Sequence, residues 1–274
     1  MLNRLEMYIE WLKTDPVDFI IYMAYTVAVV LIRLILHECA HGWMAFKCGE
    51  PTAKMMGRLS LNPARHLDPI GTLCMFLLGF GWARPVPVNP RNFRDLRRDD
   101  FMVSIAGIVT NLTLCIICIA LATAVNIFLW EPNFVTIFRM EFGSAEGLVN
   151  VFASSDASSY AMGIAYGASF EGFEPFMRNG WLLYVQRFLL LMADVNLTLA
   201  IFNLLPIPPL DGFHLLNDTL LRGRFNLNGQ MFRIAQVALI VLVMTGLLDS
   251  ILLRGSEYVG SALVRTIMMI GGQL

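Results

Sequence analysis

Long apolar runs constrain the fold of this chain more than any other feature of its sequence. Four of them reach the roughly 20 residues that an α-helix needs to cross a bilayer. They cover residues 19–46, 102–130, 181–205 and 234–253. A fifth run, residues 258–270, is shorter and contains Arg265, so it either lies at the membrane interface or completes a short crossing. We therefore expect one domain over residues 1–274, an all-α polytopic membrane protein with four to six transmembrane helices.

Composition agrees with a membrane environment. Hydrophobic residues make up 57% of the chain and charged residues only 15%, whereas a soluble domain carries roughly 25% charged residues. The net charge is −1, and no basic arm or base-stacking module is visible, so we expect no nucleic-acid partner. Residues 1–17 mix charged and apolar side chains without a cleavage-site pattern, which predicts an interfacial amphipathic helix rather than a signal peptide.

The distribution of charge predicts the orientation in the membrane. Residues 47–100 are rich in Lys and Arg, which places them in the cytoplasm by the positive-inside rule. Residues 131–180 are rich in Asp and Glu and are expected to form an extracytoplasmic loop. The region after the third span, residues 206–230, then returns to the cytoplasmic side.

Two features of the basic region predict irregular structure at the membrane surface. Residues 70–82 are apolar and Gly-rich, but basic residues flank them on both sides, which favours a re-entrant loop over a crossing. Residues 54–63 and 84–90 are predicted to form short strands of a small membrane-associated β-sheet. Proline cannot donate to a strand ladder, so the second strand is expected at an edge.

A metal-binding pattern lies inside the first apolar run. Residues 37–41 read His-Glu-Cys-Ala-His, the H-E-x-x-H pattern. On a helix, positions i and i+4 share a face, so His37 and His41 can offer two imidazole nitrogens to one zinc ion. Glu38 is rotated by about 100° from His37 and is placed to act on a metal-bound water. Ionisable groups at membrane depth are costly, which favours a functional reading of this cluster.

A catalytic zinc needs a third protein ligand and an open position for water. Three prolines, at positions 206, 208 and 209, interrupt the end of the third apolar run and release Asp211 into irregular backbone. Asp211 is our candidate third ligand. From local sequence alone, a helix N-cap ahead of Gly212 explains this aspartate equally well. His214 and His66 are the rival ligands, with His66 the more typical of a structural turn residue.

The chain resembles the site-2 protease family of intramembrane zinc metalloproteases, in particular compact bacterial-type members without a PDZ or nucleotide-sensing domain. The resemblance covers most of the chain and rests on several motifs in order. They are residues 36–42 around the histidines, Gly57–Pro63, Gly81–Pro90, the Gly107-x-x-x-Asn111 pattern and Asn203–Gly212. This sequence departs from many relatives at Ile108, which follows Ala106-Gly107 where they have proline.

The resemblance implies a zinc endopeptidase that cuts within or near transmembrane helices of single-span membrane proteins, with one Zn²⁺ per chain. It implies Asp211 as third ligand, Glu38 as general base and a substrate-handling role for Asn203. We also expect an integral inner-membrane protein, and the charge pattern places its active site toward the cytoplasm. The developing oxyanion needs a hydrogen-bond donor, and both Asn111 and Asn203 are candidates. Without a PDZ domain, residues 131–180 are the expected site of any element that filters substrates.

Two other functional classes fit parts of the pattern. A polytopic metal transporter could use His37, His41 and Asp211 as a transit site, but such a site does not need Glu38 as a base. A non-catalytic membrane scaffold could retain the motif without binding zinc. Cleavage that depends on Glu38 distinguishes the protease from both alternatives.

Overall fold

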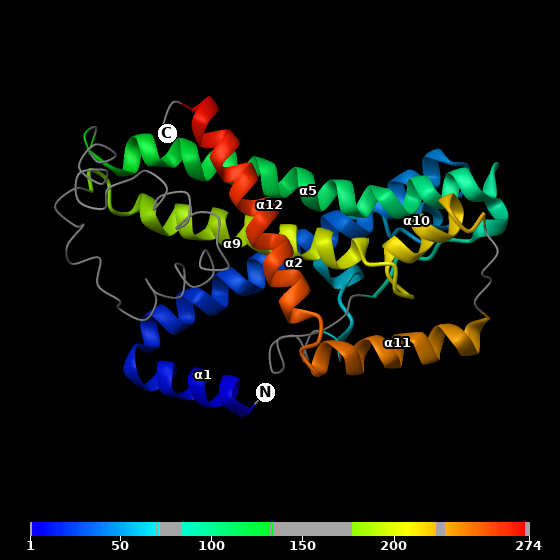
Figure 1. The fold of residues 1–274 in the computed structure, drawn as a ribbon, viewed down its shortest axis with the longest axis horizontal. Coiled ribbons are helices and arrows are strands. Elements are labelled where there is room, and N and C mark those ends of the chain that lie inside the picture. Colours follow the sequence, from blue (N-terminus) through cyan, green and yellow to red (C-terminus); the bar gives the residue numbers. More distant parts are fainter. Residues whose placement is uncertain are drawn as a thin grey trace. The chain divides into compact units, whose positions relative to one another are not determined.

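The computed structural model describes residues 2–69, 71, 84–131, 133, 177–222 and 228–271, and this part of the chain is helical, without a β-strand (Figure 1). The helices of more than one turn are α1 Leu2–Thr14, α2 Pro16–Lys47, α5 Leu96–Leu129, α9 Leu182–Leu204, α10 Asp211–Thr219, α11 Gly229–Met244 and α12 Asp249–Ile270. Shorter helical segments are α3 Thr52–Met55, η1 Pro63–Arg65 and η2 Pro90–Asn92. The all-α expectation is confirmed for the described residues.

The chain divides into two compact units that share the long helices. Unit 1 comprises Met1–Val30, Thr113–Thr198 and Leu253–Leu274, and unit 2 comprises Leu31–Leu112 and Leu199–Leu252. Unit 2 therefore holds the second half of α2, the first half of α5, the end of α9, and all of α10 and α11. Every candidate site residue of the sequence belongs to unit 2.

In unit 1, the N-terminal segment forms the expected helix and folds back on the start of α2. Trp11 is only 1% exposed, and its ring lies 5.0 Å from that of Tyr22 and 5.7 Å from that of Phe19. The chain reverses between Thr14 and Pro16, because proline favours the first turn of a new helix. Aromatic packing thus fixes α1 to α2.

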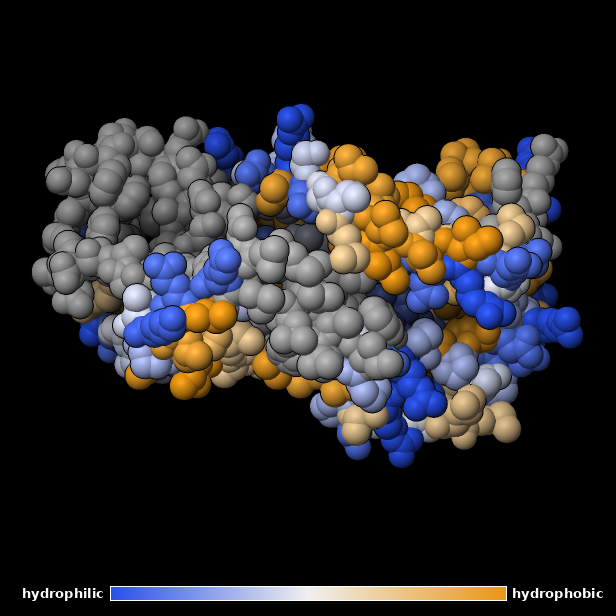
Figure 2. Space-filling model, turned by 90° about the horizontal axis from the view of Figure 1, so that it is seen from below, coloured by the Kyte–Doolittle hydropathy of each residue, from blue (hydrophilic) through white to orange (hydrophobic). Residues whose placement is uncertain are grey.

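Among the described residues, three helices are long and apolar enough to cross a membrane, and α11 and α12 would add a fourth span if together they form one. The first three cover Phe19–Lys47, Leu96–Leu129 and Leu182–Leu204, close to the predicted runs. The face shown in Figure 2 carries patches of hydrophobic side chains beside hydrophilic ones. Exposed apolar side chains on α5 and α11 include Val109, Ile117, Leu121, Ile234, Val237 and Val241. Such surfaces are suited to hydrocarbon, and the chain is a multi-pass membrane protein.

The predicted fourth span, residues 234–253, is wrong as a continuous helix. The chain breaks after Met244, where Gly246 adopts a φ of +72°, and α12 begins at Asp249 with a bend of 76°. The weaker run 258–270 belongs to α12. A positive φ is readily adopted by glycine and ends the helix inside an apolar run, which hydropathy alone does not reveal. Five or six spans are not found in the described residues.

The strand predicted over residues 54–63 is also wrong. Lys54 and Met55 lie in α3, Gly57 turns the chain with a φ of +64°, and η1 begins at Pro63. The strand predicted over residues 84–90 is wrong as well, because residues 84–89 have no regular secondary structure and η2 begins at Pro90. Their prolines remove the backbone donors that a ladder needs. The re-entrant loop predicted over 70–82 lies outside the described residues except Gly71, as does most of the loop predicted over 131–180.

Candidate metal centre and active-site pocket

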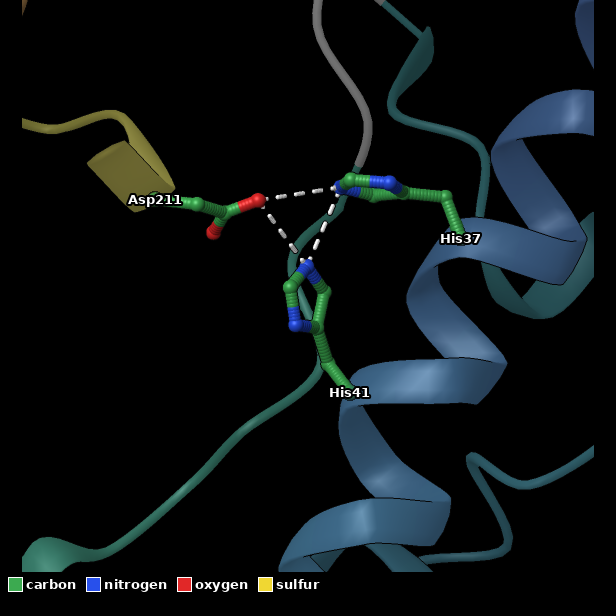
Figure 3. Close-up of side chains that lie close together, drawn as sticks. All are labelled: His37, His41 and Asp211. Carbon is green, nitrogen blue, oxygen red and sulfur yellow. Dashed lines mark hydrogen bonds and ion pairs between the residues drawn. The ribbon is translucent and has the colours of Figure 1, made fainter. Parts of the chain in front are cut away.

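Three side chains from two helices of unit 2 converge on one point (Figure 3). His37 and His41 project from the same face of α2, and their Nε2 atoms lie 3.0 Å apart. The Asp211 carboxylate, in the first turn of α10, places Oδ2 3.6 Å from His37 Nε2 and 3.5 Å from His41 Nε2. This trio is the one group of His, Cys, Asp or Glu side chains among the described residues that has metal-binding spacing.

The spacing of these atoms fits a zinc ion. Ligand atoms about 2.0–2.1 Å from a tetrahedral centre lie roughly 3.3 Å apart, which falls within the spread of the three separations. Asp211 Oδ2 is buried and has no hydrogen-bond partner in the part of the chain that the structure describes, although a buried carboxylate oxygen normally has one. A metal ion would supply the missing partner.

The break between α9 and α10 positions Asp211. α9 ends at Leu204, and short turns bond Ile207 N–H to the Leu205 carbonyl and Leu210 N–H to the Ile207 carbonyl. Gly212 lies so close to the end of α9 that a Cβ atom there would be 2.4 Å from the Leu204 carbonyl oxygen. The aspartate itself is not an N-cap, because Leu210 holds that position and no side chain caps the helix. The capping alternative is therefore wrong.

The electrostatics of Asp211 suit a metal ligand. Burial alone would raise the pKa of its carboxyl group, but the adjacent His41 imidazole and the charge of His37 hold that pKa below its usual value. A carboxylate that stays ionised is the form that coordinates zinc.

Backbone and amide groups hold both imidazole rings from behind. His41 Nδ1 lies 2.8 Å from the Val103 carbonyl oxygen on α5, which accepts the Nδ1 proton and leaves Nε2 free for a metal. His37 Nδ1 lies 3.1 Å from the side-chain amide of Asn111, one of the fully buried residues. α5 approaches this closely because position 107 is glycine: a Cβ atom there would lie 2.5 Å from His37 Cε1 and from His41 Nε2.

The carboxylate of Glu38 faces the irregular segment 84–89. Glu38 Oε2 accepts a hydrogen bond from Val86 N–H at 2.9 Å. Arg58 is buried and donates from Nη2 to the carbonyl oxygens of Arg84, at 2.6 Å, and Pro85, at 3.2 Å. Gly42, one turn after Glu38, leaves room for the Val86 side chain, which would lie 3.1 Å from a Cβ atom there. The segment 84–89 is thus fixed beside the candidate general base.

A pocket of about 530 Å³ opens over these groups. Its walls come from five parts of unit 2: α2, the segment 84–90, the start of α5, the region from Phe202 to His214, and α11. Its lining includes His37, Glu38, His41, Val86, Val88, Asp100, Asn203, Asp211, His214 and Gln236. Most of the remaining walls are apolar, so the pocket has the character of a site for a peptide with apolar side chains.

The two candidate asparagines occupy different places. Asn203 lines the pocket, and its Nδ2 lies 3.5 Å from His37 Nε2. Asn111 does not line the pocket and instead contacts the far nitrogen of the His37 ring. The sequence left their roles open because either asparagine side chain can donate a hydrogen bond, and residue type alone does not say which one faces the pocket.

The rival histidines lie away from the trio. His66 is fully buried, with Nε2 2.7 Å from the Ser60 carbonyl oxygen, which is a structural role. His214 Nδ1 lies 3.0 Å from Asp100 Oδ2 at the pocket wall. The carbonyl of Val103 and the N–H of Val86 were missed by sequence reasoning, because backbone groups carry no residue-type signal.

Comparison with known proteins identifies the family of this chain. The family model for peptidase family M50 matches residues 25–246. The chain is 35% identical to the proposed zinc metalloprotease YwhC of Bacillus subtilis over 72% of this chain and 69% of YwhC. It is 24% and 26% identical to the proposed zinc metalloproteases Rip2 of Mycolicibacterium smegmatis and Mycobacterium tuberculosis, over 74% of this chain and 61% of each relative.

No solved structure matches the chain significantly. The family match nevertheless covers most of the sequence, and its region includes all three converging side chains, Glu38 and both asparagines. The chain belongs to peptidase family M50, the zinc metalloproteases of the site-2 type.

Proposed function

We propose that this protein is an intramembrane zinc endopeptidase that hydrolyses peptide bonds within or near the transmembrane helices of single-span membrane proteins. One zinc ion per chain would be held by His37, His41 and Asp211. The observation that carries the proposal is the convergence of these three ligand atoms next to Glu38 at the end of an apolar spanning helix.

A zinc ion bound there supplies a Lewis acid that lowers the pKa of water toward neutrality and polarises the scissile carbonyl. Glu38 acts as the general base: its carboxylate takes a proton from the attacking water and delivers it to the leaving amine. The N–H of Val86 holds Oε2 of this carboxylate, and Oε1 has no hydrogen bond among the described residues. Oε1 is therefore the oxygen that we assign to proton transfer.

The asparagines divide two tasks. Asn203 lines the pocket beside His37 Nε2, so its amide N–H is placed to donate to the carbonyl oxygen as negative charge develops. If His37 coordinates through Nε2, its Nδ1 carries a proton and needs an acceptor. Asn111 Oδ1 is buried with no partner among the described residues, and a turn of the amide would bring it to that proton. We assign Asn111 to orienting His37.

The substrate must unwind, because helical hydrogen bonds shield its peptide bonds. The segment 84–89 contributes Val86 and Val88 to the pocket lining, and its prolines favour extended backbone in the residues before them. The N–H and C=O of Val88 have no hydrogen bond among the described residues. An unwound substrate strand can pair with this edge. Basic residues between 47 and 100 support a cytoplasmic position for the site.

The test compares membranes of cells that carry the wild-type protein with membranes of cells that carry Glu38→Gln. Loss of the base should reduce turnover by at least about 10³-fold while zinc content stays near one per chain. Single-span fragments should accumulate in the variant. The protease would be refuted, and the transporter alternative supported, by two results together. The wild type would take up metal into vesicles, and no membrane fragment would differ in amount between the wild type and Glu38→Gln.

A further inference from the structure

We propose that His214, held by Asp100, is a further catalytic residue that donates a hydrogen bond from Nε2 to the substrate carbonyl in the pocket. This inference rests on the proposed peptidase function and adds a residue to it.

The first support is position. His214 follows Asp211 by three residues on α10, so both side chains lie on the same face of that helix. Both line the 530 Å³ pocket together with Glu38 and Asn203. The His214 side chain is 40% exposed, which leaves part of its ring open to a bound substrate.

The second support is the partner of the ring. Asp100, on α5, accepts from His214 Nδ1 at 3.0 Å. This bond sets the orientation of the imidazole and leaves Nε2 as the nitrogen available to the pocket. A carboxylate at Nδ1 also stabilises the imidazolium form, in which Nε2 is a donor.

Charges on both helices act in the same direction. The hydrogen bond that His214 donates to Asp100 raises the pKa of His214 and outweighs the lowering by burial, and the charges of Asp100, Asp211 and Asp218 raise that pKa further. The positive charge of Arg97 lowers the pKa of Asp218. A cationic donor near the metal site would stabilise the developing oxyanion beside Asn203.

A structural role is the alternative: the His214–Asp100 bond could serve only to tie α10 to α5 and so hold Asp211. The two roles predict different measurements. A tie between helices would affect zinc content and stability, whereas a donor to the substrate would affect kcat with zinc retained.

The experiment uses the full-length protein in nanodiscs and, as substrate, the membrane fragment that accumulates in Glu38→Gln cells. The variants are His214→Gln, which keeps an N–H donor, His214→Phe, which keeps ring size without one, and Asp100→Asn. Thr219→Ala, at an exposed end of the same helix, is the matched control. Zinc content, kcat and KM are measured as a function of pH.

We expect His214→Phe to lower kcat by about 10²-fold with zinc content and KM little changed, the size of effect seen when one oxyanion donor is removed. His214→Gln should recover about tenfold of that loss. In the wild type, kcat should fall as pH rises through the His214 pKa; Asp100→Asn should move this fall to lower pH, and His214→Gln should abolish it.

Unchanged kcat in His214→Phe, or loss of zinc in parallel with activity, overturns the inference while leaving the peptidase intact. If no membrane fragment accumulates in Glu38→Gln cells relative to the wild type, the proposed function fails and this inference fails with it.

Discussion

At the scale of single residues, the site separates groups that touch the metal position from groups that orient them. His37, His41 and Asp211 present the three converging atoms, whereas the Val103 carbonyl and Asn111 contact the opposite nitrogens of the two rings. Such outer contacts fix the tautomer and direction of a ligating histidine. The two asparagines should therefore fail in different ways when they are removed.

Replacing Asn111 by Ala should weaken zinc affinity by about 10–100-fold, the usual cost of losing an outer partner of a ligating histidine. Replacing Asn203 by Ala should leave zinc affinity unchanged and lower kcat by about 10²-fold, because it removes a donor to the oxyanion. Zinc competition with a fluorescent chelator and steady-state cleavage check the two variants. Equal zinc affinities in Asn111→Ala and Asn203→Ala would contradict these separate roles.

The Asp100–Asp218–His214 group gives stability a defined pH dependence. Burial and the charge of Asp100 raise the pKa of Asp218 from 3.8 to about 6, so its ionisation costs folding free energy as pH rises between these values. The raised pKa of His214 adds stability below its ordinary pKa, and this is lost as pH rises through the raised value.

Asp218→Asn should therefore show no gain in thermal stability near pH 4 and a full gain above about pH 6.5. Solvent screening of this part-exposed group limits the gain to about 1 kcal/mol. Melting curves in detergent between pH 4 and 8 measure it. A gain of the same size at every pH would exclude the proposed ionisation.

At the scale of elements, two close approaches build the site: α5 against the histidine face of α2, and the segment 84–89 against Glu38. The first needs Gly107, and the second needs Gly42 and the clamp by Arg58. Both contacts join residues far apart in the sequence.

Gly107→Ala should abolish zinc binding while the protein still folds, because the added methyl group would lie 2.5 Å from atoms of both histidine rings. The two imidazole rings can rotate away from the methyl group, so the protein still folds. Their nitrogens then no longer converge on one point. Zinc content and circular dichroism are the measurements. Gly229→Ala, which has open space around its Cβ position, is the control and should retain zinc.

Arg58→Ala should lower kcat/KM by at least about tenfold with zinc retained, since loss of the two charge-assisted bonds releases the segment beside Glu38. The kcat/KM of Arg58→Lys should lie between those of Arg58→Ala and the wild type, because lysine keeps one charged donor group. Arg91→Ala, an exposed arginine of the same region, is the control. Full activity in Arg58→Ala would show that the segment needs no clamp.

At the scale of the whole molecule, the charge pattern predicts which ends of the spans face the cytoplasm. The N-terminal end of α5 follows the basic region, and its C-terminal end precedes the acidic one. Leu96 and Glu131, which flank this span, should therefore label from opposite sides of the membrane.

A single cysteine at position 96 should react with a membrane-impermeant maleimide only after permeabilisation, and one at position 131 in intact cells. The native cysteines are replaced by Ser or Ala in this background. Labelling of both positions from the outside would reject the orientation and, with it, the cytoplasmic active site.

Sequence patterns predicted the local parts of the fold well, and failed where the outcome depends on long-range contacts. Helix periodicity and hydropathy located α2, α5 and α9, because both are properties of consecutive residues. The strand over residues 54–63 was mistaken, since a strand exists only if a partner lies beside it. The break at Gly246 was missed because glycine is tolerated in an apolar helix and ends it only in a suitable context.

The sequence by itself determined the candidate metal ligands and the candidate base: two histidines one helical turn apart, a glutamate between them, and an aspartate released by a proline-rich break. These follow from helix geometry and residue type. Only the tertiary structure decided that Asp211 meets the histidines rather than capping α10, that Asn111 lies behind His37 while Asn203 faces the pocket, and that His214 pairs with Asp100. Those outcomes depend on packing between distant segments, and the sequence does not encode that packing in any local pattern.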